Sequence, residues 1–261
     1  CWETNALLAI NALERNKTPR LKLLIVCPKN AMVSWDEEVA ECLGTDSKVT
    51  RLQGGKTSIA RTLSNSPEIS VISYQQVRGV VELLIEFMGR EEIHLVLDES
   101  HRIKAGQSSL QGAAALALAP HAVRRDILSG TPMPQGLPDL EAQFSFLWPA
   151  LPVFRDIPPQ ATEQEQVKFA NRLIRPLFVR TTKQELGLAK PHLHPRAIEM
   201  SRSQAETYDL LKSESARFFA QLDVKDKEQL RKVGKQVMRV LQFCSNPELL
   251  RHGLRGNDKY G

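Results

Sequence analysis

Apolar runs alternate with amphipathic stretches along the first 150 residues. The runs are short and nearly uninterrupted, and they cover residues 21–27, 68–74, 93–98 and 124–129. Runs of this kind are typical of strands buried on both faces of a parallel sheet. Amphipathic or alanine-rich stretches, which predict helices, lie between them at about 30–42, 75–88 and 112–119. This alternation predicts an α/β fold, a three-layer parallel sheet with helices on both faces.

The pattern changes after Trp148, where a proline-rich connection is followed by two long amphipathic stretches near 203–222 and 226–243. We therefore predict two regions, an α/β lobe over residues 1–150 and a helical region over residues 151–261. Apolar residues recur at helical spacing in the first stretch and predict a packing stripe. They are Leu210, Leu211, Phe218, Phe219 and Leu222.

Composition excludes some classes of protein and leaves others open. The 261 residues are 42% hydrophobic and 25% charged, as in a globular protein with a substantial core. No apolar run reaches the length of a membrane span, so we expect no membrane partner. Four cysteines without C-x-x-C spacing favour an intracellular, reducing location: cytoplasm or nucleoid, or the nucleus in a eukaryote.

Charge is distributed unevenly along the chain. Residues 1–164 carry 16 Lys/Arg and 19 Asp/Glu, whereas residues 165–261 carry 19 and 11. The basic second part is consistent with binding to a polyanion, but such an excess is also common on a merely solvated face.

Gly55-Lys56-Thr57 matches the end of a phosphate-binding loop, G-x-x-x-x-G-K-[ST]. The first glycine of that motif would fall at Thr50, where a Cβ atom disfavours the required backbone conformation. We therefore predict a glycine turn that opens a surface helix, with Lys56 in solvent.

Two polar segments follow predicted buried strands. Asp98 ends the run 93–98 and Glu99 follows it directly, at the sheet edge where open α/β folds bind ligands. The pair alone could hold Mg²⁺, or Asp98 and Ser100 could only cap the next helix. Ser129-Gly130-Thr131-Pro132 ends the next run and places two hydroxyl groups at the same edge, which favours a functional site.

These segments and others resemble the Snf2-type (SWI2/SNF2) ATPases of helicase superfamily 2. "LLIVCPKNAMVSWDEEV" is similar to motif Ia, "ISVISYQQV" to motif Ib, "LVLDESHRIK" to the DExx box and "ILSGTPMPQGLPDLEAQFSFLWP" to motif III. "RPLFVRTTKQEL", "AETYDLL" and "QVMRVLQFCSNPELL" resemble later segments of the family. Three departures from the family pattern indicate a divergent member. Thr181 stands in place of a second arginine, Ser245-Asn246 in place of Asn-His, and Pro134-Gln135-Gly136 in place of Gln-Asn-Asn.

The resemblance implies a DNA-dependent ATPase that uses ATP and Mg²⁺ and moves on double-stranded DNA, with residues 1–150 as its first RecA-like lobe. It implies that Asp98 holds Mg²⁺ and that Glu99 polarises the attacking water. His101, Ser129, Gly130 and Thr131 would couple the nucleotide state to DNA. The residues expected to touch the DNA backbone are Pro28, Lys29, Ser73, Tyr74, Arg180 and Lys183.

In this family the phosphate-binding loop precedes motif Ia by one helix, which residues 4–16 resemble. We therefore expect that loop just upstream of Cys1 and the second lobe beyond residue 261, and we expect the 261 residues alone to be inactive. Another superfamily 2 helicase, acting on RNA or of the restriction type, and a non-catalytic DNA-binding scaffold remain alternatives.

Overall fold

The structure is a computed structural model that describes residues 2–18, 21–154, 160–179, 185, 187, 192–220 and 227–247. The chain divides into two compact units, residues 1–181 and residues 182–261. The sheet and the polar segments that follow its strands belong to the first unit, which is described first.

A single five-stranded parallel sheet forms the centre of the first unit. Its strands are β1 (Leu21–Cys27), β2 (Val49–Arg51), β3 (Ile69–Ser73), β4 (Glu92–Asp98) and β5 (Arg124–Leu128). They lie in the order β2-β3-β1-β4-β5, and every neighbouring pair is parallel. All five strands therefore end at one edge of the sheet.

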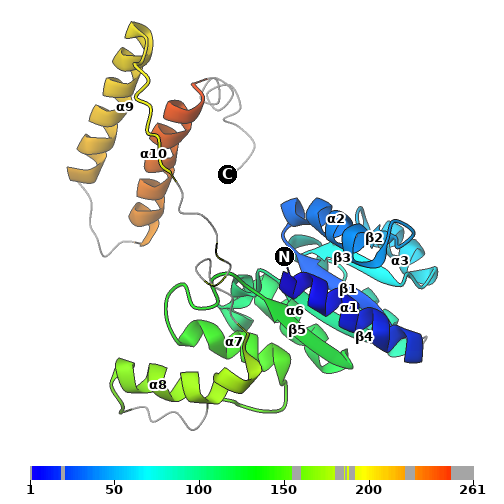
Figure 1. Cartoon of the computed structure of the whole chain (residues 1–261). Helices are drawn as coiled ribbons and strands as arrows, with labels where there is room; N and C mark the ends of the chain where they lie inside the picture. Colours follow the sequence, from blue (N-terminus) through cyan, green and yellow to red (C-terminus); the bar gives the residue numbers. More distant parts are fainter. Residues whose placement is uncertain are drawn as a thin grey trace. The chain divides into compact units, whose positions relative to one another are not determined.

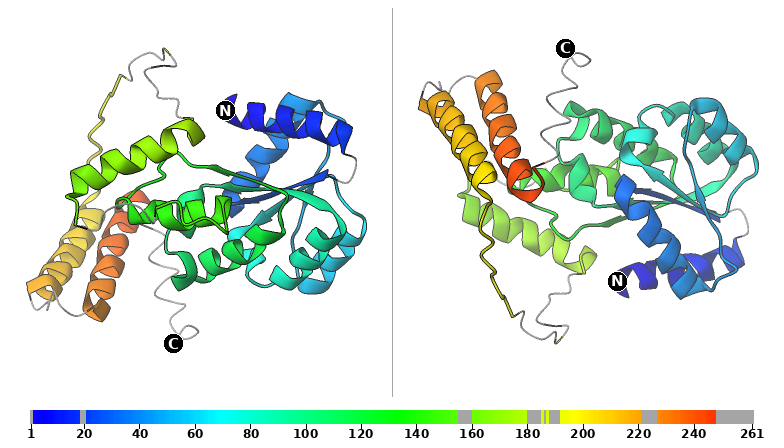
Figure 2. Two further views of the ribbon diagram at one scale, coloured as in Figure 1. Left: turned by 90° about the horizontal axis from the view of Figure 1, so that it is seen from below. Right: turned by 90° about the horizontal axis from the view of Figure 1, so that it is seen from above.

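Helices cover both faces of this sheet (Figure 1). They are α1 (Trp2–Lys17), α2 (Met32–Leu43), α3 (Lys56–Ser64), α4 (Tyr74–Val77), α5 (Val81–Arg90), α6 (Leu110–Leu118) and α7 (Pro138–Leu147). The helix α8 (Glu163–Ile174) packs against α7 instead. The left view of Figure 2 shows α1 and α2 in blue on one side of the sheet and the cyan and green helices on the other. The predicted three-layer α/β fold is confirmed.

Two buried clusters hold the layers together because neighbouring strand residues point to opposite faces. Leu23 and Ile25 of β1 pack with Trp35 and Val39 of α2, whereas Leu24 of β1 and its neighbour Val26 belong to the second cluster. That larger cluster also contains buried residues of α3, α5 and α6. Strands covered on both faces explain why their sequences read as continuous apolar runs.

The helix boundaries differ from the prediction at two places. The stretch 75–88 forms two helices, because Gly79 and its neighbours separate α4 from α5. The helix predicted at about 30–42 begins later, at Met32: residues Lys29–Ala31 form the short 3-10 helix η1, and Ala31 is the N-cap residue of α2. The edge strand β2 is not among the four apolar runs listed above, because none of its three residues is fully buried.

The first unit continues past residue 150, where we predicted the lobe to end. Leu140 and Phe144 of α7 pack with Ile174 at the end of α8. The helix α8 begins with a capping box in which the Thr162 side chain accepts from the backbone N–H of Glu165 and the Glu165 carboxylate accepts from that of Thr162. The boundary of the family's lobe at residue 150 stays a prediction.

The described residues of the second unit form two helices of 19 residues, α9 (Arg202–Ala220) and α10 (Lys227–Ser245), which pack against each other. The predicted stripe is partly correct: Leu211 and Phe218 are half-buried, while Leu210 and Phe219 are exposed. Leu222 lies outside the described residues.

Candidate active site at the carboxyl edge of the sheet

The two polar segments predicted from the sequence lie side by side. Asp98, the last residue of β4, pairs in register with Leu128, the last residue of β5. The segments 99–103 and 129–133 therefore leave the sheet at neighbouring points of one edge. Ligands of open parallel sheets bind at this edge.

The Asp98 carboxylate has one buried side-chain donor. The indole Nε1–H of Trp35, from α2, donates to Asp98 Oδ2 at 3.1 Å, and Trp35 is only 4% exposed. Burial raises the pKa of Asp98, while the bond from Trp35 opposes the rise and the nearby Glu99 adds to it. Burial, together with the charge of Asp98, also raises the pKa of Cys27 to about 12, so this thiol stays neutral.

The backbone after Asp98 is held in an unusual conformation. Glu99 has φ 52° and ψ 50°, which lie in the left-handed region that residues other than glycine and asparagine rarely adopt. The Tyr74 hydroxyl donates to the carbonyl oxygen of Asp98 at 2.8 Å and fixes the peptide that precedes Glu99. Uncommon backbone conformations cost free energy and concentrate at functional sites.

Glu99 and Asp98 have different partners. Glu99 Oε2 lies 3.2 Å from Nδ1 of His101, so the imidazole can orient this carboxylate. The same nitrogen is 3.4 Å from Ser129 Oγ and 3.5 Å from Thr131 Oγ1, distances at the outer limit of a hydrogen bond. The structure thus brings His101, Ser129 and Thr131 together but joins them only loosely, and exposed Gly130 has no side chain to contribute.

A stronger link between the two segments involves Gln143, which sequence reasoning missed. Ser100 Oγ donates to Gln143 Oε1 at 2.6 Å, and Gln143 Nε2 donates to the carbonyl oxygen of Pro132 at 2.7 Å. Gln143 and Ser100 are both 0% exposed. The sequence offered one signal for Gln143, namely a polar residue beside the core residues Leu140 and Phe144. Trp35 was also missed, although it lies within the segment that resembles motif Ia.

The residues predicted to touch DNA have different positions. Lys29 is exposed, whereas Pro28, Ser73 and Tyr74 are buried. The Ser73 side chain caps α4 by accepting from the N–H of Gln76, and the Tyr74 hydroxyl is bonded to Asp98. Among these four, the Lys29 side chain is the one placed to meet a phosphate. Arg180 and Lys183 lie outside the described residues.

Gly55 and Lys56 form the predicted surface turn. Gly55 is the N-cap residue of α3. The Lys56 side chain is 63% exposed, and its Nζ lies 4.0 Å from Glu82 Oε2. This ion pair is on the surface, as expected for a solvated lysine.

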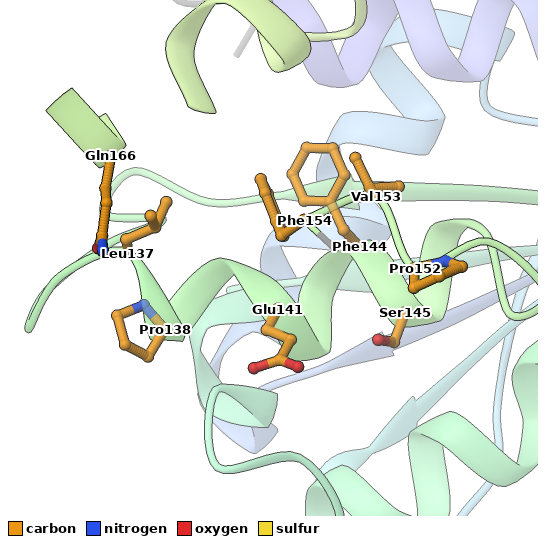
Figure 3. Close-up of a pocket in the computed structure, with 9 residues that line it drawn as sticks. All are labelled: Leu137, Pro138, Glu141, Phe144, Ser145, Pro152, Val153, Phe154 and Gln166. Atoms are coloured by element: carbon orange, nitrogen blue, oxygen red, sulfur yellow. The ribbon is translucent and has the colours of Figure 1, made fainter. Parts of the chain in front are cut away.

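A cavity of about 450 Å³ lies away from the strand ends, between α7 and the segment that follows it (Figure 3). Phe144 and Phe154 meet edge to face there, with ring centroids 5.0 Å apart, and Val153 lies beside them. Its lining adds Glu141, Ser145 and Gln166 to these apolar groups but includes no lysine or arginine to bind a phosphate, so the carboxyl edge remains the candidate active site.

Mg²⁺ usually binds one or two carboxylates together with water and substrate phosphates. Asp98 fits this role because it is half-buried and Trp35 engages one of its oxygens. Within the part of the chain that the structure describes, no group of three or more His, Cys, Asp or Glu could hold a metal by itself. A single carboxylate assisted by phosphates is therefore the arrangement that these residues support.

The fold and this edge define the class: a RecA-like α/β lobe with adjacent acidic residues after a central strand. Residues 4–249 match the SNF2-related domain, and the chain belongs to that family. It is 26% identical to the DNA repair and recombination protein RAD54 of Saccharomyces cerevisiae, across 88% of this chain and 29% of that protein. It is 23% identical to the transcription regulatory protein SNF2 of the same yeast, across 88% of this chain and 15% of that protein.

A solved structure has the same fold. The Sulfolobus solfataricus SWI2/SNF2 ATPase core in complex with dsDNA aligns with a TM-score of 0.55 at 17% identity, over 94% of this chain and 52% of that one. The chain spans less than a third of the two curated relatives named above. Among the described residues, no helix is both long and apolar enough to cross a membrane.

Proposed function

We propose that this chain is the first RecA-like lobe and the following helical region of an ATPase that moves on double-stranded DNA. The observation that carries the proposal is the pair of adjacent carboxylates at the end of β4, which have separate partners, with the backbone of Glu99 in the left-handed conformation. Two neighbouring acids in different environments can perform two different tasks. Family membership and the double-stranded DNA bound by the Sulfolobus relative support the same conclusion.

Asp98 would hold the Mg²⁺ that accompanies ATP, with Trp35 occupying one carboxylate oxygen and leaving the other for the metal. The metal would supply charge neutralisation at the phosphates. Glu99, oriented by His101, would accept a proton from the water that attacks the terminal phosphate. Tyr74 would keep the peptide between the two acids in place.

The test compares two Glu→Gln substitutions at the two ends of β4 in the natural protein that carries this domain. Glu99→Gln should retain nucleotide binding and lower DNA-stimulated turnover by at least about 100-fold, because an amide is a far weaker proton acceptor. Glu92→Gln, at the opposite end of β4, changes the same charge and should leave turnover unchanged.

Two results would contradict the proposal in different ways. Near-normal turnover by Glu99→Gln would remove this carboxylate from the mechanism. A natural protein that binds DNA but hydrolyses no ATP would indicate the scaffold function instead.

A further inference from the structure

The side chain of Gln143 makes three hydrogen bonds at the centre of the candidate site. Oε1 accepts from Ser100 Oγ at 2.6 Å, while Nε2 donates to the carbonyl oxygens of Pro132 at 2.7 Å and Asp139 at 2.8 Å. An amide nitrogen has two hydrogens to donate, and both are used. The two carbonyl partners fix the orientation of the amide, so its oxygen must face Ser100.

This arrangement spans three parts of the fold. Ser100 begins the turn after β4, Pro132 lies in the loop after β5, and Gln143 belongs to α7. Ser100 and Gln143 are fully buried, so a broken bond between them could not be replaced by bulk water. By contrast, His101 reaches Ser129 and Thr131 only at 3.4–3.5 Å.

From these contacts we infer that Gln143 is the positioning residue that couples the segment after β4 to the segment after β5. Movement of Ser100, directly after the two acids, is transmitted through the amide to Pro132 and thus to Ser129–Thr131. This inference rests on the proposed function, because it assigns Gln143 to the communication between ATP turnover and DNA.

Four variants of the natural protein test the role: Ser100→Ala, Gln143→Met, the double variant and Ser109→Ala. The measured quantity is the ratio of DNA-stimulated to basal ATP turnover. Each substitution in the bridge should lower the ratio by about five-fold or more, and the double variant should lower it no further. Ser109→Ala removes the side-chain cap of α6 without touching Gln143 and should leave the ratio unchanged.

The melting temperature distinguishes a coupling role of Gln143 from a purely structural role. Ser100→Ala leaves Gln143 Oε1 buried without a donor. The double variant replaces both partners of that bond by apolar groups and leaves only the half-buried Pro132 carbonyl to water, so it should recover melting temperature. Coupling predicts that the double variant regains stability but not the ratio. Hydrogen exchange on the 261-residue chain should also show faster exchange at 129–133 in Ser100→Ala than in Ser109→Ala.

The inference would be overturned if the single variants left the ratio of DNA-stimulated to basal turnover unchanged. It would also be overturned if the double variant recovered both stability and this ratio. Those results are distinct from failure of the proposed function, in which the unaltered protein would show no ATP turnover with or without DNA.

Discussion

Two aspartates on neighbouring strands, Asp126 and Asp98, have opposite environments. Asp126 of β5 accepts from His94 Nε2 at 2.7 Å and from Arg124 Nε at 2.9 Å. Burial raises the pKa of Asp126, but these bonds outweigh it and lower the pKa below its usual value. Asp98 of β4 has a single side-chain donor, Trp35, and burial raises its pKa.

The histidines differ in the same way. His94 is 0% exposed, and the amide Nδ2 of Asn11 donates to its Nδ1 at 3.0 Å, so Nε2 must carry the proton that Asp126 accepts. Arg124 extends this network to Glu14 of α1 at 2.7 Å. The half-buried His101 contacts Glu99 and has only long contacts besides. A carboxylate with several partners holds α1 to the sheet, whereas one with few partners remains available for a ligand.

The largest expected effect comes from breaking the hydrogen-bonded cluster of Asp126, His94 and Arg124. Asp126→Ala would leave the buried Nε2–H of His94 without an acceptor, so the free energy of unfolding should fall by about 1–3 kcal/mol. Urea unfolding of the 261-residue chain measures this. Glu14→Ala is the control, because its ion pair with Arg124 is about a third exposed on each side and should cost less than about 1 kcal/mol.

The same pair of proteins gives a pH test. Because the pKa of Asp126 is lower in the folded state, its contribution is complete above the unfolded value of about 3.9 and is lost as pH falls through the folded value. The stability difference between the unaltered chain and Asp126→Ala should therefore shrink under acid conditions. A difference that grew there would show that Asp126 is not the stabilising anion.

The next effect concerns the two histidines. In the natural protein, His101→Ala should lower DNA-stimulated turnover by roughly five-fold or more, since Glu99 loses the group that orients it. Its melting temperature should change little, because the lost contact is partly exposed. His94→Ala should have the opposite effects. Its melting temperature should fall, while DNA-stimulated turnover per folded molecule should be retained. Equal losses of turnover in His101→Ala and His94→Ala would contradict the distinction between the His94–Asp126 pair and the His101–Glu99 pair.

A smaller effect of unusual sign is expected at Asp98. Because the pKa of Asp98 is raised on folding, its ionised form destabilises the protein once pH rises above the unfolded value. Asp98→Asn keeps an oxygen that can accept from Trp35 and should melt a few degrees higher at pH 7, while the gain should disappear near pH 4. Thermal unfolding at both pH values checks this, and a lower melting temperature at pH 7 would refute it.

The sequence predicted the parts of this site that depend on strand position. Buried runs that end in Asp98-Glu99 and in Ser129-Gly130-Thr131 had to meet if the strands were parallel neighbours. Their neighbours across space were not predictable in the same way. Nothing in local periodicity shows that Trp35 reaches Asp98, that Tyr74 is bonded inward, or that Gln143 joins two loops, because these contacts depend on how α2, α4 and α7 pack.

The smallest expected effect compares two lysines. Lys29 follows β1 and is exposed at the carboxyl edge, and Lys56 is exposed at the start of α3. Each phosphate contact releases counterions, so a plot of log affinity against log salt becomes shallower by about 0.9 when one contact is removed.

Lys29→Ala should therefore reduce the slope for duplex DNA by about 0.9 and weaken all sequences alike, whereas Lys56→Ala should leave the slope unchanged. Neither substitution should alter stability measurably, because exposed lysines contribute little to it. Titrating both variants of the natural protein at several salt concentrations decides between them. Equal slopes for Lys29→Ala and the unaltered protein would place the DNA away from the end of β1. A reduced slope for Lys56→Ala would show instead that the turn at Gly55 binds phosphate of the DNA backbone.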